Sequence, residues 1–140
     1  MSAVIPPRRE FKKWMKYLNG QVHDLEHFRA YKVGEDGVKR PVGNYAVLVT
    51  RDGMGHVGHS MVSGKDQYNS KRGFAIAVGR AMKAAVKPNG EIPLPVWAPE
   101  RGDKMLFGVE LRDRCRDLLV KDIGKLVPSG YGSLCRYGQD

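Results

Sequence analysis

Cysteine, acidic residues in the first half and long apolar runs are all scarce in this sequence of 140 residues. The two cysteines, Cys115 and Cys135, are too few for a disulfide framework, so we expect both to be packing residues in a reduced protein. No stretch reaches the roughly 18 apolar residues of a membrane span. The first nine residues also lack the apolar run of a signal peptide. These absences favour a cytoplasmic protein without a membrane partner.

The composition is that of a folded protein, with 41% hydrophobic and 28% charged residues. The length suits one domain, which we place at residues 1–128, followed by a flexible tail over residues 129–140. No repeat and no low-complexity run divides the chain further.

The positive charge is confined to one part of the chain. Residues 1–87 carry 16 Lys and Arg against 7 Asp and Glu, which accounts for the whole net charge of +9. Residues 88–140 carry 8 of each sign and are neutral. Localised positive charge favours a nucleic acid or an acidic protein surface as the partner, while solubility alone is the simpler interpretation.

Hydrophobic periodicity predicts an α+β domain, in which a small antiparallel sheet of three to four strands packs against two or three helices. The expected helices cover roughly residues 7–18, 66–87 and 111–127. The expected strands cover residues 28–33, 44–51, 56–63 and, as a fourth candidate, 105–110. A proline-rich connector over residues 88–104 separates the basic part from the neutral part.

The first expected helix has an apolar face and a basic face. The apolar residues recur at i, i+3, i+4 and i+7, namely Phe11, Trp14, Met15 and Leu18. Lys12, Lys13 and Lys16 occupy much of the rest. Trp14 and Tyr17 beside these lysines could stack on bases of a single strand, although the spacing of Trp14 favours the core.

The second expected helix, residues 66–87, has three kinds of surface. One stripe is apolar (Phe74, Val78, Met82, Val86) and a second is small (Gly73, Ala77, Ala81, Ala85). Together these stripes would let the helix lie close on a sheet. The remaining side, with Arg72, Ile76, Arg80, Lys83 and Lys87, is largely basic and would face outward. Gly55 and Gly58 weaken the preceding strand and suggest a β-bulge there.

The order helix, strand, strand, strand, helix over residues 8–87 resembles the double-stranded-RNA-binding domain. In that family, lysines at the start of the last helix grip phosphates across a groove. The resemblance implies that role for Lys65, Lys71 and Arg72. The segment Lys71-Arg72-Gly73-Phe74-Ala75 stands where the family has Lys-Lys-x-Ala-Lys.

The segment from Lys65 to Ala81 also resembles small tailed-bacteriophage proteins of unassigned function, which share a pattern Lys-Asp-x-Phe-Asn-x-Lys-x-Gly-Arg-x-Ile-Ala-x-Gly-Arg. Phe74 replaces an arginine of that pattern, and the match spans about 20 of 140 residues. The resemblance implies a phage protein in the host cytoplasm. It opens two alternatives to nucleic-acid binding, namely an effector that inhibits a host polymerase or defence nuclease, and a virion component.

For the virion alternative, the apolar connector Ile92-Pro-Leu-Pro-Val-Trp97 is the expected site of self-association. Trp97 lies between prolines and is either a cap over the core or an exposed anchor. The sequence favours neither reading of Trp97.

The four histidines suggest a metal site at first sight. His23 and His27 have the spacing of a helical metal pair, and His56 and His59 could complete it. However, His56 and His59 point to opposite faces of a regular strand, and the patterns of known zinc enzymes are absent. We therefore expect no metal and no other cofactor.

A catalytic site is equally weakly indicated. Asp103 with Glu110-Leu111-Arg112 is similar to the Asp…Glu-x-Lys arrangement of metal-dependent nucleases, but Arg112 occupies the lysine position. We expect no enzyme. The sequence instead favours binding of DNA or RNA through backbone charge, or binding of an acidic host protein. The residues expected to carry it are Lys65, Lys71, Arg72, Arg80 and Lys83, supported by Lys12, Lys13 and Lys16.

Overall fold

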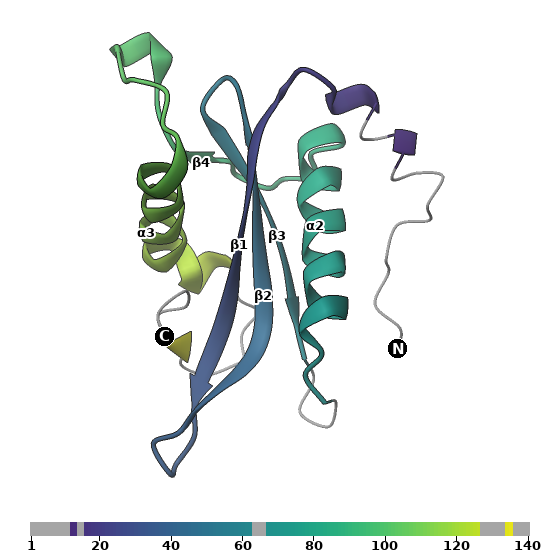
Figure 1. Cartoon of the computed structure of the whole chain (residues 1–140), viewed down its shortest axis with the longest axis vertical. Helices are drawn as coiled ribbons and strands as arrows, with labels where there is room; N and C mark the ends of the chain where they lie inside the picture. The colour runs from purple at the N-terminus through teal and green to yellow at the C-terminus, as the bar shows by residue number, and fades with distance from the viewer. Residues whose placement is uncertain (1–11, 14–15, 63–66, 127–133, 136–140) are drawn as a thin grey trace.

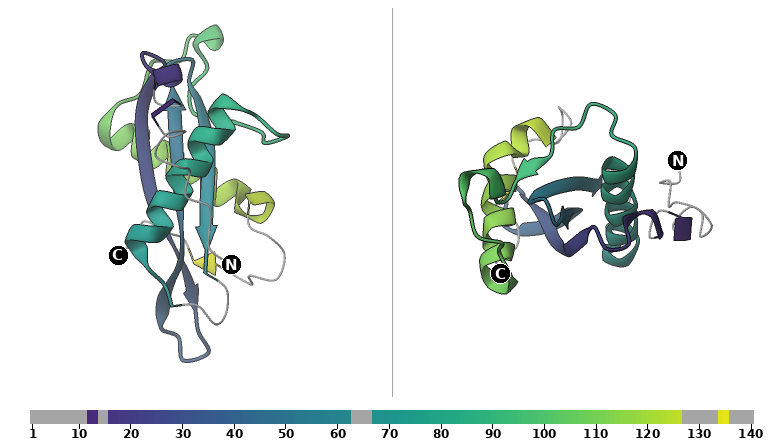
Figure 2. Two further views of the ribbon diagram at one scale, coloured as in Figure 1. Left: turned by 90° about the vertical axis from the view of Figure 1, so that its right-hand side faces the viewer. Right: turned by 90° about the horizontal axis from the view of Figure 1, so that it is seen from above.

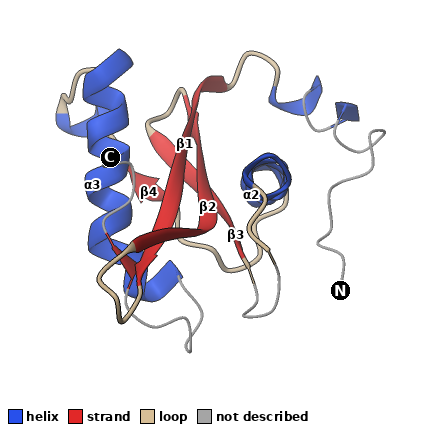
Figure 3. Cartoon of the chain, turned by 60° about the horizontal axis from the view of Figure 1, so that its bottom comes forward, coloured by secondary structure: helices blue, strands red, loops and turns tan. Residues whose placement is uncertain are grey.

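The computed structural model describes residues 12–13, 16–62, 67–126 and 134–135 of the chain. A long antiparallel sheet lies between two helices, α2 (Ser70–Val86) and α3 (Gly108–Leu126), which cover its opposite faces (Figures 1 and 3). The three long strands are β1 (Val22–Val33), β2 (Lys39–Thr50) and β3 (Met54–Met61). The predicted α+β fold class is confirmed.

The sheet has the order β4-β3-β2-β1-β5 within the described residues. Its two edge strands are only two residues long, β4 (Leu94–Pro95) beside β3 and β5 (Leu134–Cys135) beside β1. Strand β5 was not predicted, and it lies in the part that we expected to be a tail. Proline lacks a backbone N–H, so the edge position suits Pro95.

Each face of the sheet has its own core. Residues of β2 alternate between the two, and Tyr45, Val47 and Val49 pack with Leu111 and Leu119 of α3. Ala46 and Leu48 pack with Ala77, Ala81 and Met82 of α2. Because helices cover both faces, β2 is buried over its whole second half and shows no polar alternation.

Gly58 is the position where β3 and α2 come closest. A Cβ atom on Gly58 would lie less than 3.0 Å from the carbonyl oxygen of Ala77 and the backbone nitrogen of Ala81. The predicted small stripe of α2 therefore does lie on the sheet. The predicted bulge is wrong, because β2 and β3 pair in unbroken register from Gly43–Met61 to Val49–Gly55. The glycine serves close packing instead.

Helix α2 begins at Ser70, four residues later than predicted. The side chain of Asn69 accepts a hydrogen bond from Arg72 N at 3.0 Å and caps the helix. Ile76 is a second correction, since it was assigned to the outward basic side and is only 3% exposed.

The first predicted helix lies partly outside the described residues, which include neither Phe11, Trp14 nor Met15. The described residues of this segment, 12–13 and 16–18, are helical. Leu18 is 1% exposed and belongs to the same core as Val78 and Met82 of α2. This contact places the segment beside the C-terminal half of α2 (Figure 2).

The predicted strand at residues 105–110 is wrong. Residues 103–107 are irregular and α3 begins at Gly108, three residues before the predicted start. The carboxylate of Asp103 instead accepts a hydrogen bond from Ala98 N at 2.9 Å, which closes the turn around a short 3₁₀-helix, Pro99–Arg101. Trp97 is 4% exposed, so its role as a cap over the core is the correct one.

Cys115 is also a core residue, fully buried among Phe28 and the leucines of α3. Burial raises the pKa of its thiol to about 12. A thiol that stays protonated at neutral pH is unreactive, as expected for a packing residue.

Candidate nucleic-acid interface and an adjoining cavity

The exposed cations of α2 form a row along one side of the helix. At about 100° per residue, Arg72, Arg80, Lys83 and Lys87 lie within an arc of roughly 80°, and all four are exposed. The row is about 22 Å long, because a helix rises about 1.5 Å per residue. Lys71 is exposed as well and lies about 100° around the helix from Arg72. We call Lys71, Arg72, Arg80, Lys83 and Lys87 the α2 cations.

No α2 cation takes part in an ion pair within the part of the chain that the structure describes. Helix α2 contains no acidic residue at all. The ion pairs found elsewhere join Arg40 to Asp36, Arg112 to Glu26 and Arg116 to Asp113. Arg80 does have a partner, since its Nη1 donates to the carbonyl oxygen of His59 at 2.7 Å. Within the described residues, no salt bridge therefore neutralises these cations.

Two of these cations stand where a helix disfavours them. Lys71 and Arg72 lie in the first turn of α2, and this turn contains no acidic residue. The N-terminus of a helix carries partial positive charge, so each cation there costs roughly 0.3–1 kcal/mol. Helix stability therefore does not explain why Lys71 and Arg72 are present.

The N-terminal lysines lie on a segment that packs beside the other end of α2. Lys12, Lys13 and Lys16 are exposed, and Leu18 ties their segment to the C-terminal half of α2. The segment that carries these lysines thus lies beside the C-terminal half of α2, whereas the first turn of α2, with Lys71 and Arg72, is at the opposite end of the helix (Figure 1). Lys65, the remaining predicted binding residue, lies outside the described residues.

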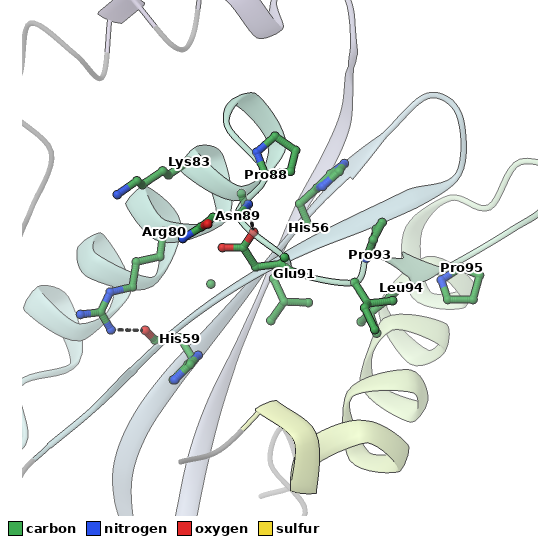
Figure 4. A pocket seen from close by; sticks show the side chains of 15 residues that line it. His56, His59, Arg80, Lys83, Pro88, Asn89, Glu91, Pro93, Leu94 and Pro95 are labelled. Atoms are coloured by element: carbon green, nitrogen blue, oxygen red, sulfur yellow. Dashed lines mark hydrogen bonds between the residues drawn. The ribbon is translucent and has the colours of Figure 1, made fainter.

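A cavity of about 600 Å³ opens beside this surface, between β3, the C-terminal half of α2 and residues 88–95 (Figure 4). Arg80 and Lys83 reach it from α2, and His56 and His59 reach it from β3. The carboxylate of Glu91 accepts a hydrogen bond from Asn89 N, and this bond lowers the pKa of Glu91. The sequence did not predict the cavity, because the positions of the prolines do not determine the path that residues 88–93 take relative to the sheet.

The histidines are dispersed over β1 and β3. His23 and His27 lie on a strand, so the helical spacing assumed for them does not apply. His23 Nε2 donates to the carbonyl oxygen of Leu106 at 2.7 Å. A register shift after Val22 precedes His27, which packs against Phe74 of α2. No group of three or more potential metal ligands occurs among the described residues.

Asn44 is a buried polar residue that the sequence analysis overlooked. It is 0% exposed, donates from Nδ2 to His27 Nε2 at 2.7 Å and accepts from the hydroxyl of Tyr68 at 3.1 Å. Gly73 leaves room for this amide, since a Cβ atom there would lie less than 3.0 Å from Asn44 Oδ1. The network fixes Tyr68 just before α2 and so positions the first turn with its two cations.

Asn44→Ala should therefore lower the free energy of unfolding by about 2 kcal/mol, because the buried partners lose their hydrogen bonds. The prediction is checked by urea denaturation. Asn89→Ala is the matched control, since Asn89 is exposed and its recorded hydrogen bond uses the main-chain nitrogen. Equal stabilities of the two variants would show that the Asn44 network contributes nothing.

Three histidines should make stability depend on pH. Burial is the largest cause of the lowered pKa values of His27, His56 and His59, and cations add to it at His27 (Arg29, Arg112) and at His59 (Arg80). The unfolded chain then binds more protons than the native state below about pH 6.5, so stability falls as the pH drops through this range. We expect the urea midpoint to decrease between pH 7.5 and pH 5.5. A midpoint that rises over this interval would contradict the assignment.

Two of the residues considered for catalysis, Asp103 and Arg112, interact with other residues. Asp103 is held by Ala98 N, and Arg112 lies 3.5 Å from the carboxylate of Glu26 with its guanidinium carbon 5.0 Å from the ring centroid of Phe28. Glu110 is exposed on the first turn of α3. Asp103 and Arg112 thus have structural partners instead of each other.

Comparison of the chain with protein-family models, with curated proteins and with solved structures gives no match. Within the described residues, no helix combines the length and the apolar character that crossing a membrane requires.

Proposed function

We propose that the protein binds nucleic acid through its phosphate backbone, using the α2 cations together with Lys12, Lys13 and Lys16. The observation that carries this proposal is the set of surface cations on α2, none of which forms an ion pair among the described residues. Folded proteins usually intersperse charges of both signs on an exposed face. The α2 cations form no ion pair among the described residues, and two of them lie at an unfavourable helix end, which together support an anionic partner.

The length of the row favours a polymer over an isolated acidic side chain. Duplex DNA carries one negative charge per roughly 1.7 Å of axis, so phosphates are available along the whole helix. Each contact releases a condensed counterion, which supplies free energy without reading the base sequence. Binding of this kind tolerates DNA and RNA, single and double strands, and depends steeply on salt.

The two resemblances noted in the sequence are compatible with this proposal. In double-stranded-RNA-binding domains, lysines at the start of the last helix hold phosphates, and Lys71 and Arg72 occupy the first turn of α2. A basic phage protein in the host cytoplasm would meet both host and phage nucleic acid. Inhibition of a host protein through the same cations is the alternative that the test below separates.

The experiment uses nuclease-treated full-length protein with labelled duplex DNA, single-stranded DNA and duplex RNA, each at 50 and 200 mM salt. We expect at least one polymer to bind at low salt and to lose about tenfold or more in affinity at high salt, as counterion release requires. Absence of binding to all three polymers at 50 mM salt would overturn the proposal and leave an acidic protein as the partner of the row.

A further inference from the structure

The outer edge of β3 is open over most of its length. β4 pairs only with Met54 and Gly55, and it is the last strand of the sheet on that side. Within the described part of the chain, no strand pairs with the outer edge of residues 56–61. An open edge offers backbone N–H and C=O groups to any extended chain that can reach them.

The direction of these groups follows from neighbouring hydrogen bonds. Gly53 O accepts from Val96 N on the outer side, and Val62 N donates to Val42 O on the inner side. Hydrogen-bonding direction alternates along an antiparallel strand, so Val57, His59 and Met61 point their backbone groups outward. The bond from Arg80 Nη1 to His59 O agrees with this assignment.

The chain that precedes β4 leaves the edge instead of covering it. If β4 continued in the register Gly55–Leu94, Ile92 would lie opposite Val57 and Gly90 opposite His59. Gly90 adopts φ +82°, which no strand permits, and Ile92 is 83% exposed. The cavity of about 600 Å³ lies beside β3, where a longer β4 would otherwise run (Figure 4).

The charges around the cavity favour an acidic occupant. Arg80 and Lys83 line it from α2, and Glu91 is the one carboxylate among the described lining residues. Glu91 accepts a hydrogen bond from Asn89 N and also interacts electrostatically with Lys83, so the cations around the cavity outnumber the carboxylates. Arg80 donates a hydrogen bond to His59 O, and a backbone N–H of an added strand would use the same carbonyl oxygen as its acceptor. An incoming strand would replace this bond and free the guanidinium for a carboxylate of the same strand.

We propose that the edge of β3 binds an extended segment of a partner protein that carries Asp or Glu, and that this segment adds a strand to the sheet. Backbone hydrogen bonds to Val57, His59 and Met61 hold it, while Arg80 and Lys83 select its acidic side chain. A nucleic acid has no backbone that matches this ladder, so the site is distinct from the phosphate-binding row even though Arg80 and Lys83 border both.

The test begins with a yeast-displayed library of random nine-residue peptides, selected against the full-length protein. Peptides rich in Asp or Glu with β-branched neighbours should be enriched, and those selected are synthesised for fluorescence anisotropy. Val57→Pro removes an outward N–H that has no strand partner among the described residues, a change that edge strands tolerate. Val57→Ala is the matched control, because it loses the same side chain but keeps the N–H.

The proposal predicts at least tenfold weaker peptide binding by Val57→Pro and by Lys83→Glu, and a change under twofold by Val57→Ala. Duplex DNA should bind Val57→Pro as it binds the parent, which separates this site from the phosphate-binding row. Two N-methylated forms of a selected peptide provide a test that needs no variant of the protein. One form is methylated at the odd-numbered nitrogens and the other at the even-numbered nitrogens. One form should lose binding and the other should keep it, because only every second N–H of an added strand faces β3.

Three results would overturn the proposal. The first is a selection without enrichment of acidic peptides. The second is an equal effect of N-methylation at the odd-numbered and at the even-numbered peptide nitrogens. The third is a dimer of the parent protein in sedimentation experiments that Val57→Pro does not form. A second copy of the chain would then cover the edge of β3.

Discussion

Gly58→Ala will destabilise the domain by roughly 3 kcal/mol, at the upper end of what overpacking costs. The new methyl group would meet backbone atoms of Ala77, Arg80 and Ala81 at less than 3.0 Å. Backbone atoms in a helix cannot rotate away as a side chain can, so α2 must move off β3 as a unit. The movement would open the core that Leu18, Leu48 and Met82 share. Thermal unfolding should show a midpoint about 10 °C lower, given a few degrees per kcal/mol for a chain of this size.

Gly34→Ala is the control for this effect. Its methyl group would meet only the ends of the exposed Arg40 and Asp36 side chains, which can shift. We expect less than about 1 kcal/mol of destabilisation there, because exposed surface substitutions are usually small. If the two alanine variants lost the same stability, the close approach of β3 and α2 would not be what positions the helix.

The double variant Lys71→Glu/Arg72→Glu should bind nucleic acid at least about 60-fold more weakly in 0.1 M salt, because each lost phosphate contact forfeits roughly 0.9 log units there. Stability should change in the opposite direction. Acidic residues suit the first turn of a helix, so replacing two cations should raise the free energy of unfolding by about 1–2 kcal/mol. Anisotropy with labelled duplex and urea denaturation measure the two quantities on one preparation.

The control is Arg101→Glu/Lys104→Glu, which changes the net charge by the same amount at two exposed positions outside α2. Loss of affinity in both double variants to the same degree would show that overall charge, and not the α2 cations, governs binding. A first-turn variant that bound as tightly as the parent would remove Lys71 and Arg72 from the interface.

The packing of α2 could be predicted because two residue patterns in its sequence indicate the same buried face. Four small residues recur at steps of four and the hydrophobic stripe runs beside them, so either pattern alone indicates the buried face. Ile76 could not be placed in this way. It lies in the same arc as Arg72 and Lys83, and only tertiary packing explains its burial.

The neutral part of the chain was harder to predict. Residues 105–107 include Leu106 and Phe107, which read as a short strand, but Gly108 with φ +57° starts a helix instead. Asn44 and the cavity depend on residues far apart in sequence. Tyr68 reaches Asn44 across 24 residues, and Arg80 reaches His59 across 21, and no local pattern records either contact.

The central claim, that the α2 cations bind phosphates, is tested most directly by the slope of log affinity against log salt concentration. Each phosphate contact contributes about −0.9 to this slope on duplex DNA, so one contact from each of the five α2 cations predicts a value near −4.5. The double variant at Lys71 and Arg72 should reduce the magnitude by about 1.8, which corresponds to two contacts. A parent slope near zero, or a slope that the variant leaves unchanged, would contradict the account.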